Sequence, residues 1–190
     1  MPDPALTDRF DRALLLASGV HRAQCRKGTT VPYVSHLLAV CALVLEHGGD
    51  EDQAIAALLH DAPEDQGGQV ILDRIRADFG PRVAELVAAT GEPIHLKSAC
   101  WHDRKQAFLA RLETTPSDAL LIVATDKVHN LSNLLAERSR CGDAVFERFG
   151  GGREGTLWYY RCLAELLSPA VPTALAARLT EMAVALQSPA

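Results

Sequence analysis

The chain has 190 residues, which is long enough for one buried core and short for two domains. Of its residues, 48% are apolar and 23% are charged, as in an ordinary globular protein. Its net charge of −5, without any Lys/Arg-rich run, argues against extended binding to a nucleic-acid backbone, because such binding needs clustered cations. No apolar run approaches the roughly 18 residues of a membrane span, and the N-terminus lacks a secretory signal pattern. We therefore expect a soluble, cytoplasmic protein that binds neither nucleic acid nor a membrane.

Apolar residues recur at a helical spacing along nearly the whole chain, and no alternating pattern predicts a strand. The predicted helices cover, in chain order, residues 6–20, 32–47, 50–61, 69–79, 81–90, 101–112, 117–138, 154–167 and 172–187. The predicted loops are 25–31, 64–68, 91–98 and 142–153, and the triple glycine at 150–152 indicates a flexible break. Because the linkers are short, we expect an all-α fold, a single compact bundle of about nine or ten helices.

The five cysteines are odd in number and widely spaced, and none forms a CxxC pair. This spacing predicts neither a disulfide framework nor a zinc knuckle. We expect all of them to be small core residues of a reduced protein: Cys25, Cys41, Cys100, Cys141 and Cys162.

The most informative sequence is LLHDAPED, in which an apolar helix runs directly into His60 and Asp61. A carboxylate on the core side of a helix is costly unless a cation or hydrogen bonds compensate it. Pro63 tends to break the helix, so Glu64 and Asp65 are expected in a loop or a new turn beside this pair. The structural alternative is a helix end with a favourable histidine, followed by a solvated acidic loop.

Two further polar residues interrupt apolar helices. His36 lies in an apolar stretch, where a lone histidine is more often a core residue than a ligand. Asp126 follows a strongly apolar run on the long helix and needs a partner. We do not expect the adjacent Lys127 to be that partner, because neighbouring side chains diverge on a helix.

Together these segments supply two imidazoles and two carboxylates that could converge on one divalent ion. A set of this kind without thiolates suits Mn²⁺, with Fe²⁺ or Mg²⁺ as alternatives. Such an ion lowers the pKa of bound water and neutralises charge on a phosphoryl group. Glu64 or Asp65 would then serve as the general base or acid.

The order of these residues resembles the HD superfamily of metal phosphohydrolases. Their surroundings resemble, more narrowly, the hydrolase domain of Rel/SpoT-type enzymes and the stand-alone small alarmone hydrolases. The similarity rests on the words RKG at 26–28, PYVSH at 32–36, HDAPED at 60–65 and DKVHNL at 126–131. We therefore expect one HD domain over residues 1–190, with core motifs in 13–135 and C-terminal helices in 154–187.

The resemblance implies a role for each matching residue. The implied Mn²⁺ ligands are His36, His60, Asp61 and Asp126. The implied catalytic acidic pair is Glu64 and Asp65, and the implied contacts to the nucleotide and its phosphates are Arg26, Lys27 and Asn130. The implied reaction removes the 3′-diphosphate from ppGpp or pppGpp, and a toxin-type alarmone synthetase would be a functional partner.

Two alternatives stay open at this point. The same metal centre could act on another nucleotide: ppApp, NADPH with loss of its 2′-phosphate, or a dNTP. The second alternative belongs to another functional class: this chain would be a non-catalytic HD module that senses a nucleotide or serves as an antitoxin. Loss of a ligand or of the acidic pair would favour that class, and the sequence shows no such loss.

Overall fold

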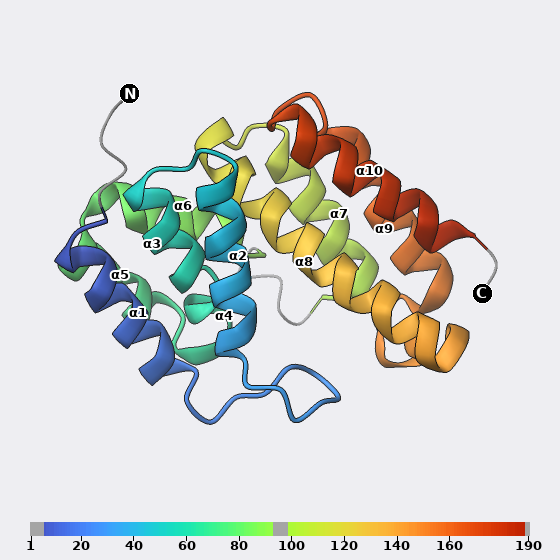
Figure 1. Cartoon of the computed structure of the whole chain (residues 1–190), viewed down its shortest axis with the longest axis horizontal. Helices are drawn as coiled ribbons and strands as arrows, with labels where there is room; N and C mark the ends of the chain where they lie inside the picture. The colour runs from blue at the N-terminus through green and yellow to red at the C-terminus, as the bar shows by residue number, and fades with distance from the viewer. Residues whose placement is uncertain (1–5, 93–98, 189–190) are drawn as a thin grey trace. The chain divides into compact units, whose positions relative to one another are not determined.

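The computed structural model describes residues 6–92 and 99–188, and within them every regular element is helical (Figure 1). There are ten α-helices and one 3-10 helix in the described residues, which confirms the all-α expectation. The chain divides into two compact units, a first unit (residues 1–94) and a second unit (residues 95–190). The expectation of a single domain over the whole chain stays a prediction. No helix in the described part is both long and apolar enough to cross a membrane.

The first unit is built around a short buried helix. Its helices are α1 (Asp8–Val20), α2 (Val34–Glu46), α3 (Glu51–Leu59), α4 (Ala62–Gln66), α5 (Gln69–Phe79) and α6 (Pro81–Thr90). Every residue of α3 from Gln53 to Leu59 is buried, and α1, α2 and α6 all pack against this helix. The residues that follow α3 therefore emerge from the core of the unit.

The two ends of α3 have clear local causes. At its start, Asp50 forms a capping box: its Oδ1 accepts a hydrogen bond from the Gln53 backbone at 3.0 Å, and Gln53 Oε1 accepts one from the Asp50 backbone at 2.9 Å. After α3, Pro63 lies in the first turn of α4, where its missing N–H costs little. Glu64 and Asp65 are therefore helical, so the loop predicted at 64–68 is wrong for its first three residues, and the alternative of a new turn is confirmed.

The second unit contains the longest helix of the described chain. Its elements are α7 (Trp101–Leu112), α8 (Ser117–Cys141), the 3-10 helix η2 (Gly142–Arg148), α9 (Gly152–Leu167) and α10 (Thr173–Gln187). Both α8 and α9 pack against α10, which is red in Figure 1, and α9 also packs against α7. The prediction of a loop over 142–153 is wrong, since most of that stretch forms η2 and the start of α9.

The glycines between η2 and α9 allow a tryptophan to approach closely. A methyl group added at Gly151 would overlap the six-membered ring of Trp101, and one at Gly155 would lie 2.9 Å from it. At Gly150 the same addition would approach the Trp101 side chain to 3.2 Å. The helical path does break here, as predicted, and the close packing of Trp101 supplies a reason for these glycines.

A buried arginine ties the end of α8 to its neighbours. Arg138 donates from Nε to Asp143 Oδ1 at 2.8 Å, and from its two terminal nitrogens to the carbonyl oxygens of Leu186 and Ser188 at 2.9 and 2.8 Å. These bonds compensate the burial of its charge and fasten α8 to η2 and to the C-terminal end of α10.

The cysteines are less buried than expected. Cys41 is a core residue of α2, and burial raises the pKa of its thiol to about 11. Cys162 is half-buried, and the other three, Cys25, Cys100 and Cys141, are exposed, so the core prediction is wrong for them. All five are free thiols, which agrees with the absence of a disulfide framework.

Candidate metal centre

Three of the predicted ligands converge within the first unit. His36 lies in the first turn of α2 and His60 directly after α3, and their exposed fractions are 1% and 3%. The Nε2 atom of His36 lies 3.4 Å from Oδ2 of Asp61, and the Nε2 atom of His60 lies 3.0 Å from the same oxygen. The two rings meet edge to face, with their centroids 5.3 Å apart.

The orientation of His60 fits a bound cation. Its Nδ1 lies 2.8 Å from the carbonyl oxygen of Ala57, which can only accept, so Nδ1 carries a hydrogen and donates it. Nε2 then faces the carboxylate oxygen of Asp61, an approach that needs a proton or a metal ion between the two atoms. A backbone bond of this kind to the far nitrogen is typical of metal-binding histidines. Two imidazoles and a carboxylate therefore fit a divalent ion.

Asp61 is held as a carboxylate. Burial by itself would raise its pKa, but the nearby imidazoles of His60 and His36 outweigh burial and hold the pKa well below its usual range. An ionised oxygen is what a hard or borderline metal ion requires of an aspartate ligand.

Tyr33 belongs to this cluster, although the sequence analysis gave it no role. Its hydroxyl donates to Asp61 Oδ2 at 2.6 Å. It lies three positions before His36, the spacing of neighbours on one helix face, and α2 begins directly after it. That spacing is the signal by which the sequence could have identified it.

The predicted acidic pair lies on α4, beside Asp61, and both of its residues are exposed. Gln24 donates from Nε2 to Asp65 Oδ2 at 2.6 Å and accepts at Oε1 from Gln66 Nε2 at 2.8 Å. Gln24 thereby connects the segment before α2 to α4, a contact that the sequence analysis missed. Both side chains are exposed to solvent, which the alternative of a solvated acidic segment also predicted. They lie a few residues after His60 and Asp61, two of the converging ligands.

The predicted loop 25–31 is a narrow turn closed by backbone bonds. Arg26 N donates to Val31 O at 2.9 Å, and Cys25 forms an isolated bridge with Pro32. Gly28 has a φ of +76°, a conformation that favours glycine at the tip. Lys27 is exposed on this turn, and the guanidinium carbon of Arg26 lies 5.6 Å from the centre of the Tyr33 ring.

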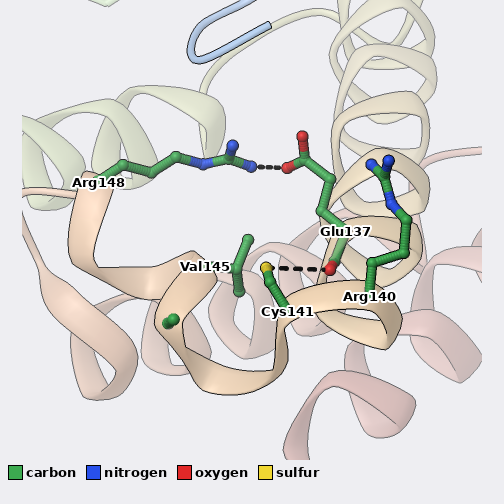
Figure 2. A pocket seen from close by; sticks show the side chains of 6 residues that line it. Glu137, Arg140, Cys141, Val145 and Arg148 are labelled. Atoms are coloured by element: carbon green, nitrogen blue, oxygen red, sulfur yellow. Dashed lines mark hydrogen bonds and ion pairs between the residues drawn. The ribbon is translucent and has the colours of Figure 1, made fainter.

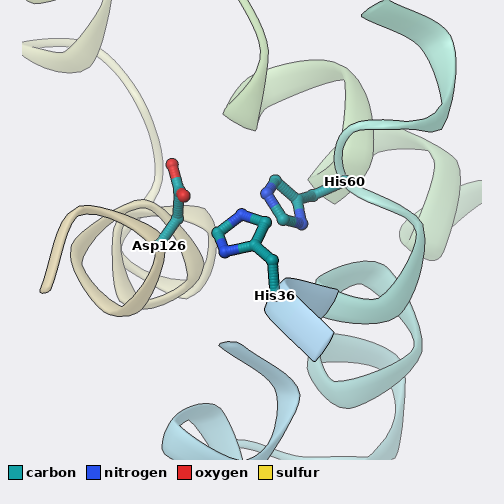
Figure 3. A group of neighbouring side chains, drawn as sticks. All are labelled: His36, His60 and Asp126. Carbon is teal, nitrogen blue, oxygen red and sulfur yellow. The ribbon is translucent and has the colours of Figure 1, made fainter. Parts of the chain in front are cut away.

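The fourth predicted ligand, Asp126, lies on α8 in the second unit and is 7% exposed. Its Oδ1 accepts a hydrogen bond from Asn130 Nδ2 at 2.5 Å, and its Oδ2 lies 2.6 Å from Lys127 Nζ. The expectation that Lys127 would not pair with Asp126 is therefore wrong. The long, flexible lysine stem reaches back to the carboxylate, with Nζ 5.2 Å from the ring centre of Phe108. Figure 3 shows Asp126, His36 and His60 with the elements that carry them.

The charge of Lys127 is secured by its neighbours. Burial by itself would lower its pKa, but the carboxylate of Asp126 outweighs burial and raises the pKa well above the usual value. Asn130, for which a nucleotide contact was predicted, holds the other oxygen of the same carboxylate. Both oxygens of Asp126 are thus held in place by side chains of its own helix.

A separate cavity of about 340 Å³ lies at the C-terminal end of α8 and contains none of the predicted site residues (Figure 2). Its lining residues are Glu137, Arg140, Cys141, Ala144, Val145 and Arg148. An ion pair between Arg148 and Glu137 crosses it, and Cys141 Sγ donates to the Glu137 carbonyl at 3.2 Å. The ion pair joins η2 to α8, and the thiol bond lies within the last turn of α8.

Comparisons with known proteins agree on one family. The family model described as HD domain matches residues 13–157. Over 133 residues the chain is 33% identical to the guanosine-3′,5′-bis(diphosphate) 3′-pyrophosphohydrolase of Aquifex aeolicus, covering 69% of this chain and 18% of that protein. It is 32% identical over 132 residues to the bifunctional (p)ppGpp synthase/hydrolase SpoT of Escherichia coli K12, covering 66% and 18%. The chain thus spans less than a fifth of these relatives.

One solved structure is similar to this chain over nearly the whole length of both proteins. It is a metazoan ortholog of SpoT, described as hydrolyzing ppGpp and playing a role in starvation responses. The likeness covers 93% of this chain and 94% of that one, with a TM-score of 0.75 and 25% sequence identity.

Proposed function

The chain belongs to the HD-domain family, and on this premise we propose that it is a metal-dependent hydrolase that removes the 3′-diphosphate from ppGpp or pppGpp. The observation that carries the proposal is the convergence of two buried imidazoles on one oxygen of Asp61. The substrate is supported by the relatives named for this reaction, and by the full-length similarity to a protein described as hydrolyzing ppGpp.

We assign the metal ligands to His36, His60, Asp61 and Asp126, and the metal to Mn²⁺. The bound ion would supply an acidified water and neutralise charge on the phosphoryl group. The bond between His60 and the Ala57 carbonyl leaves Nε2 as the nitrogen that can bind the ion, and Lys127 and Asn130 orient the carboxylate of Asp126.

The acidic pair and the Arg-Lys turn would handle the proton and the substrate. Glu64 or Asp65 would accept the proton of the attacking water, and Gln24 orients Asp65 by holding its Oδ2. Arg26 and Lys27 would bind the anionic nucleotide with charge-assisted hydrogen bonds, together with Asn130. A toxin-type alarmone synthetase, whose product this activity would destroy, is the functional partner that we propose. The cytoplasmic location stays a prediction.

Stripping and restoring the metal tests the reaction. Protein treated with EDTA and reloaded with Mn²⁺ is incubated with ppGpp, pppGpp, ppApp, NADPH and dGTP, and released pyrophosphate and phosphate are measured. We expect pyrophosphate from ppGpp and pppGpp after reloading and none before it. Phosphate from NADPH, or a preference for ppApp, would contradict the substrate and keep the metal centre. Metal-loaded protein that cleaves nothing would contradict the enzyme assignment and favour a nucleotide-binding module.

Three variants test the assignment of residues. Asp61→Asn removes the carboxylate on which both imidazoles converge, and Glu64→Gln removes one member of the acidic pair. We expect each to lower the hydrolysis rate by at least about 100-fold, because outer-shell partners alone cost roughly 10- to 100-fold in metal sites. Asp73→Asn, an exposed change on α5, is the matched control and should retain full activity.

A further inference from the structure

We propose that Tyr33 is a positioning residue that serves two parts of the site at once. Its hydroxyl orients the metal-binding carboxylate of Asp61, and its ring holds the guanidinium of Arg26 in place for the nucleotide. The inference rests on the proposed function and assigns a role to a residue outside the ligands, the acidic pair and the Arg-Lys turn.

The hydroxyl of Tyr33 makes a short hydrogen bond to the oxygen at the centre of the cluster. Tyr33 donates to Asp61 Oδ2 at 2.6 Å, the same atom that faces Nε2 of His36 and of His60. A carboxylate that accepts this bond loses rotational freedom about its terminal torsion. The hydroxyl therefore has the position of an outer-shell group in a metal site: it is hydrogen-bonded to a ligand and fixes the direction of that ligand.

The ring of Tyr33 is itself held on several sides. It stacks on His21 with centroids 5.0 Å apart and an interplanar angle of 17°, and it meets His36 edge to face at 5.6 Å. His21 is 2% exposed, and its Nδ1 lies 2.7 Å from Gln24 Oε1. The ring cannot shift without disturbing a buried neighbour, which makes it a firm support.

The same ring supports Arg26. The guanidinium carbon lies 5.6 Å from the ring centroid, within the range of a cation–π contact. The backbone reinforces the placement, since Tyr33 N donates to Gln24 O at 2.9 Å and so closes the turn that carries Arg26. Tyr33 thus joins the turn to the metal ligands through a single side chain.

Two substitutions separate the two roles. Tyr33→Phe keeps the ring and removes the hydroxyl, whereas Tyr33→Leu removes both. Mn²⁺ affinity is measured by calorimetric titration without nucleotide, and kcat and KM are measured at saturating Mn²⁺. We expect Tyr33→Phe to bind Mn²⁺ about 10- to 100-fold more weakly with KM within about twofold of wild type. Tyr33→Leu should show the same metal defect and a KM raised about threefold to tenfold.

A double-mutant cycle identifies Arg26 as the group that the ring supports. Arg26→Ala should raise KM in the wild-type background and have a much smaller effect in the Tyr33→Leu background. Effects on KM that multiply independently would overturn the role of the ring, and unchanged Mn²⁺ affinity in Tyr33→Phe would overturn the role of the hydroxyl.

Two comparisons keep the result interpretable. Ser35→Ala, an exposed change in the first turn of α2, should match wild type in metal affinity and KM. Wild-type protein that binds Mn²⁺ and leaves every nucleotide intact would contradict the proposed function, and the calorimetric comparison of Tyr33→Phe with wild type would still decide the role of the hydroxyl.

Discussion

The Nδ1 atom of His60 lies 2.8 Å from the carbonyl oxygen of Ala57, three residues earlier in the last turn of α3. This bond fixes the ring and directs Nε2 toward Asp61, so the site is oriented before any ion binds. A preorganised site that exists only in the folded state links metal binding to stability.

We therefore expect Mn²⁺ to stabilise the wild-type protein against thermal unfolding. At a free Mn²⁺ concentration about 100 times the dissociation constant, the gain should be about 2.7 kcal/mol. For a chain of this size that gain corresponds to a Tm increase of roughly 5 to 10 °C. Scanning fluorimetry of EDTA-treated protein with and without Mn²⁺ measures it. His60→Gln should lose most of the increase, and an equal increase in this variant would contradict the ligand role of His60.

The ionised carboxylate of Glu51 should stabilise the folded protein at neutral pH, and this stabilisation should be lost in acid. Burial by itself would raise its pKa, but hydrogen bonds from Thr7 and the charge of Arg9 outweigh burial and lower it below 4.5. Because the folded pKa is below the unfolded one, the stabilisation is complete above the unfolded pKa and is lost as pH falls through the folded pKa. Glu51→Gln should cost about 1 kcal/mol at pH 7 and less below pH 4.5.

Urea unfolding at a series of pH values measures this difference. Glu165→Gln, an exposed change on α9, serves as the control and should follow the wild-type profile. A Glu51→Gln deficit that stays constant down to pH 3 would show that its contacts with Thr7 and Arg9 do not depend on the charge.

Gly151→Ala should destabilise the second unit. The added methyl group would overlap the Trp101 ring, and relieving such a clash costs about 1 to 3 kcal/mol. Gly19→Ala is the matched control, because nothing lies within 4 Å of a methyl group at that helical position. This control should be neutral or stabilise by up to about 1 kcal/mol, since alanine favours helices. Equal stability of the two variants in urea would contradict the close packing of Trp101.

Cys41 should resist alkylation in the folded protein. With a thiol pKa of about 11, only roughly a thousandth of it is thiolate at pH 8, and burial also blocks the reagent. The exposed Cys25, Cys100 and Cys141 should react with iodoacetamide first. Peptide mapping after timed labelling identifies the modified residues, and labelling in urea should reach Cys41 as well. Fast labelling of Cys41 without urea would show that α2 opens locally.

The helices could be predicted because their signals are local. The predicted bounds of 69–79 and 101–112 agree with those of α5 and α7. The candidate ligands were also recognisable, because His36, His60, Asp61 and Asp126 each interrupt an apolar helix or end one. Periodicity, capping residues and motif words need only the residues within a few turns of each position.

Local signals do not specify distances between helices, and these were decided by tertiary packing. That Nε2 of His36 and of His60 face one oxygen of Asp61 depends on how α2 packs against α3. The hydroxyl of Tyr33 reaches Asp61 for the same reason. The lysine that pairs with Asp126 lies beside a phenylalanine of another helix, α7. A sequence pattern shows which face of a helix is buried, but the distance between polar groups on different helices is set by how those helices pack.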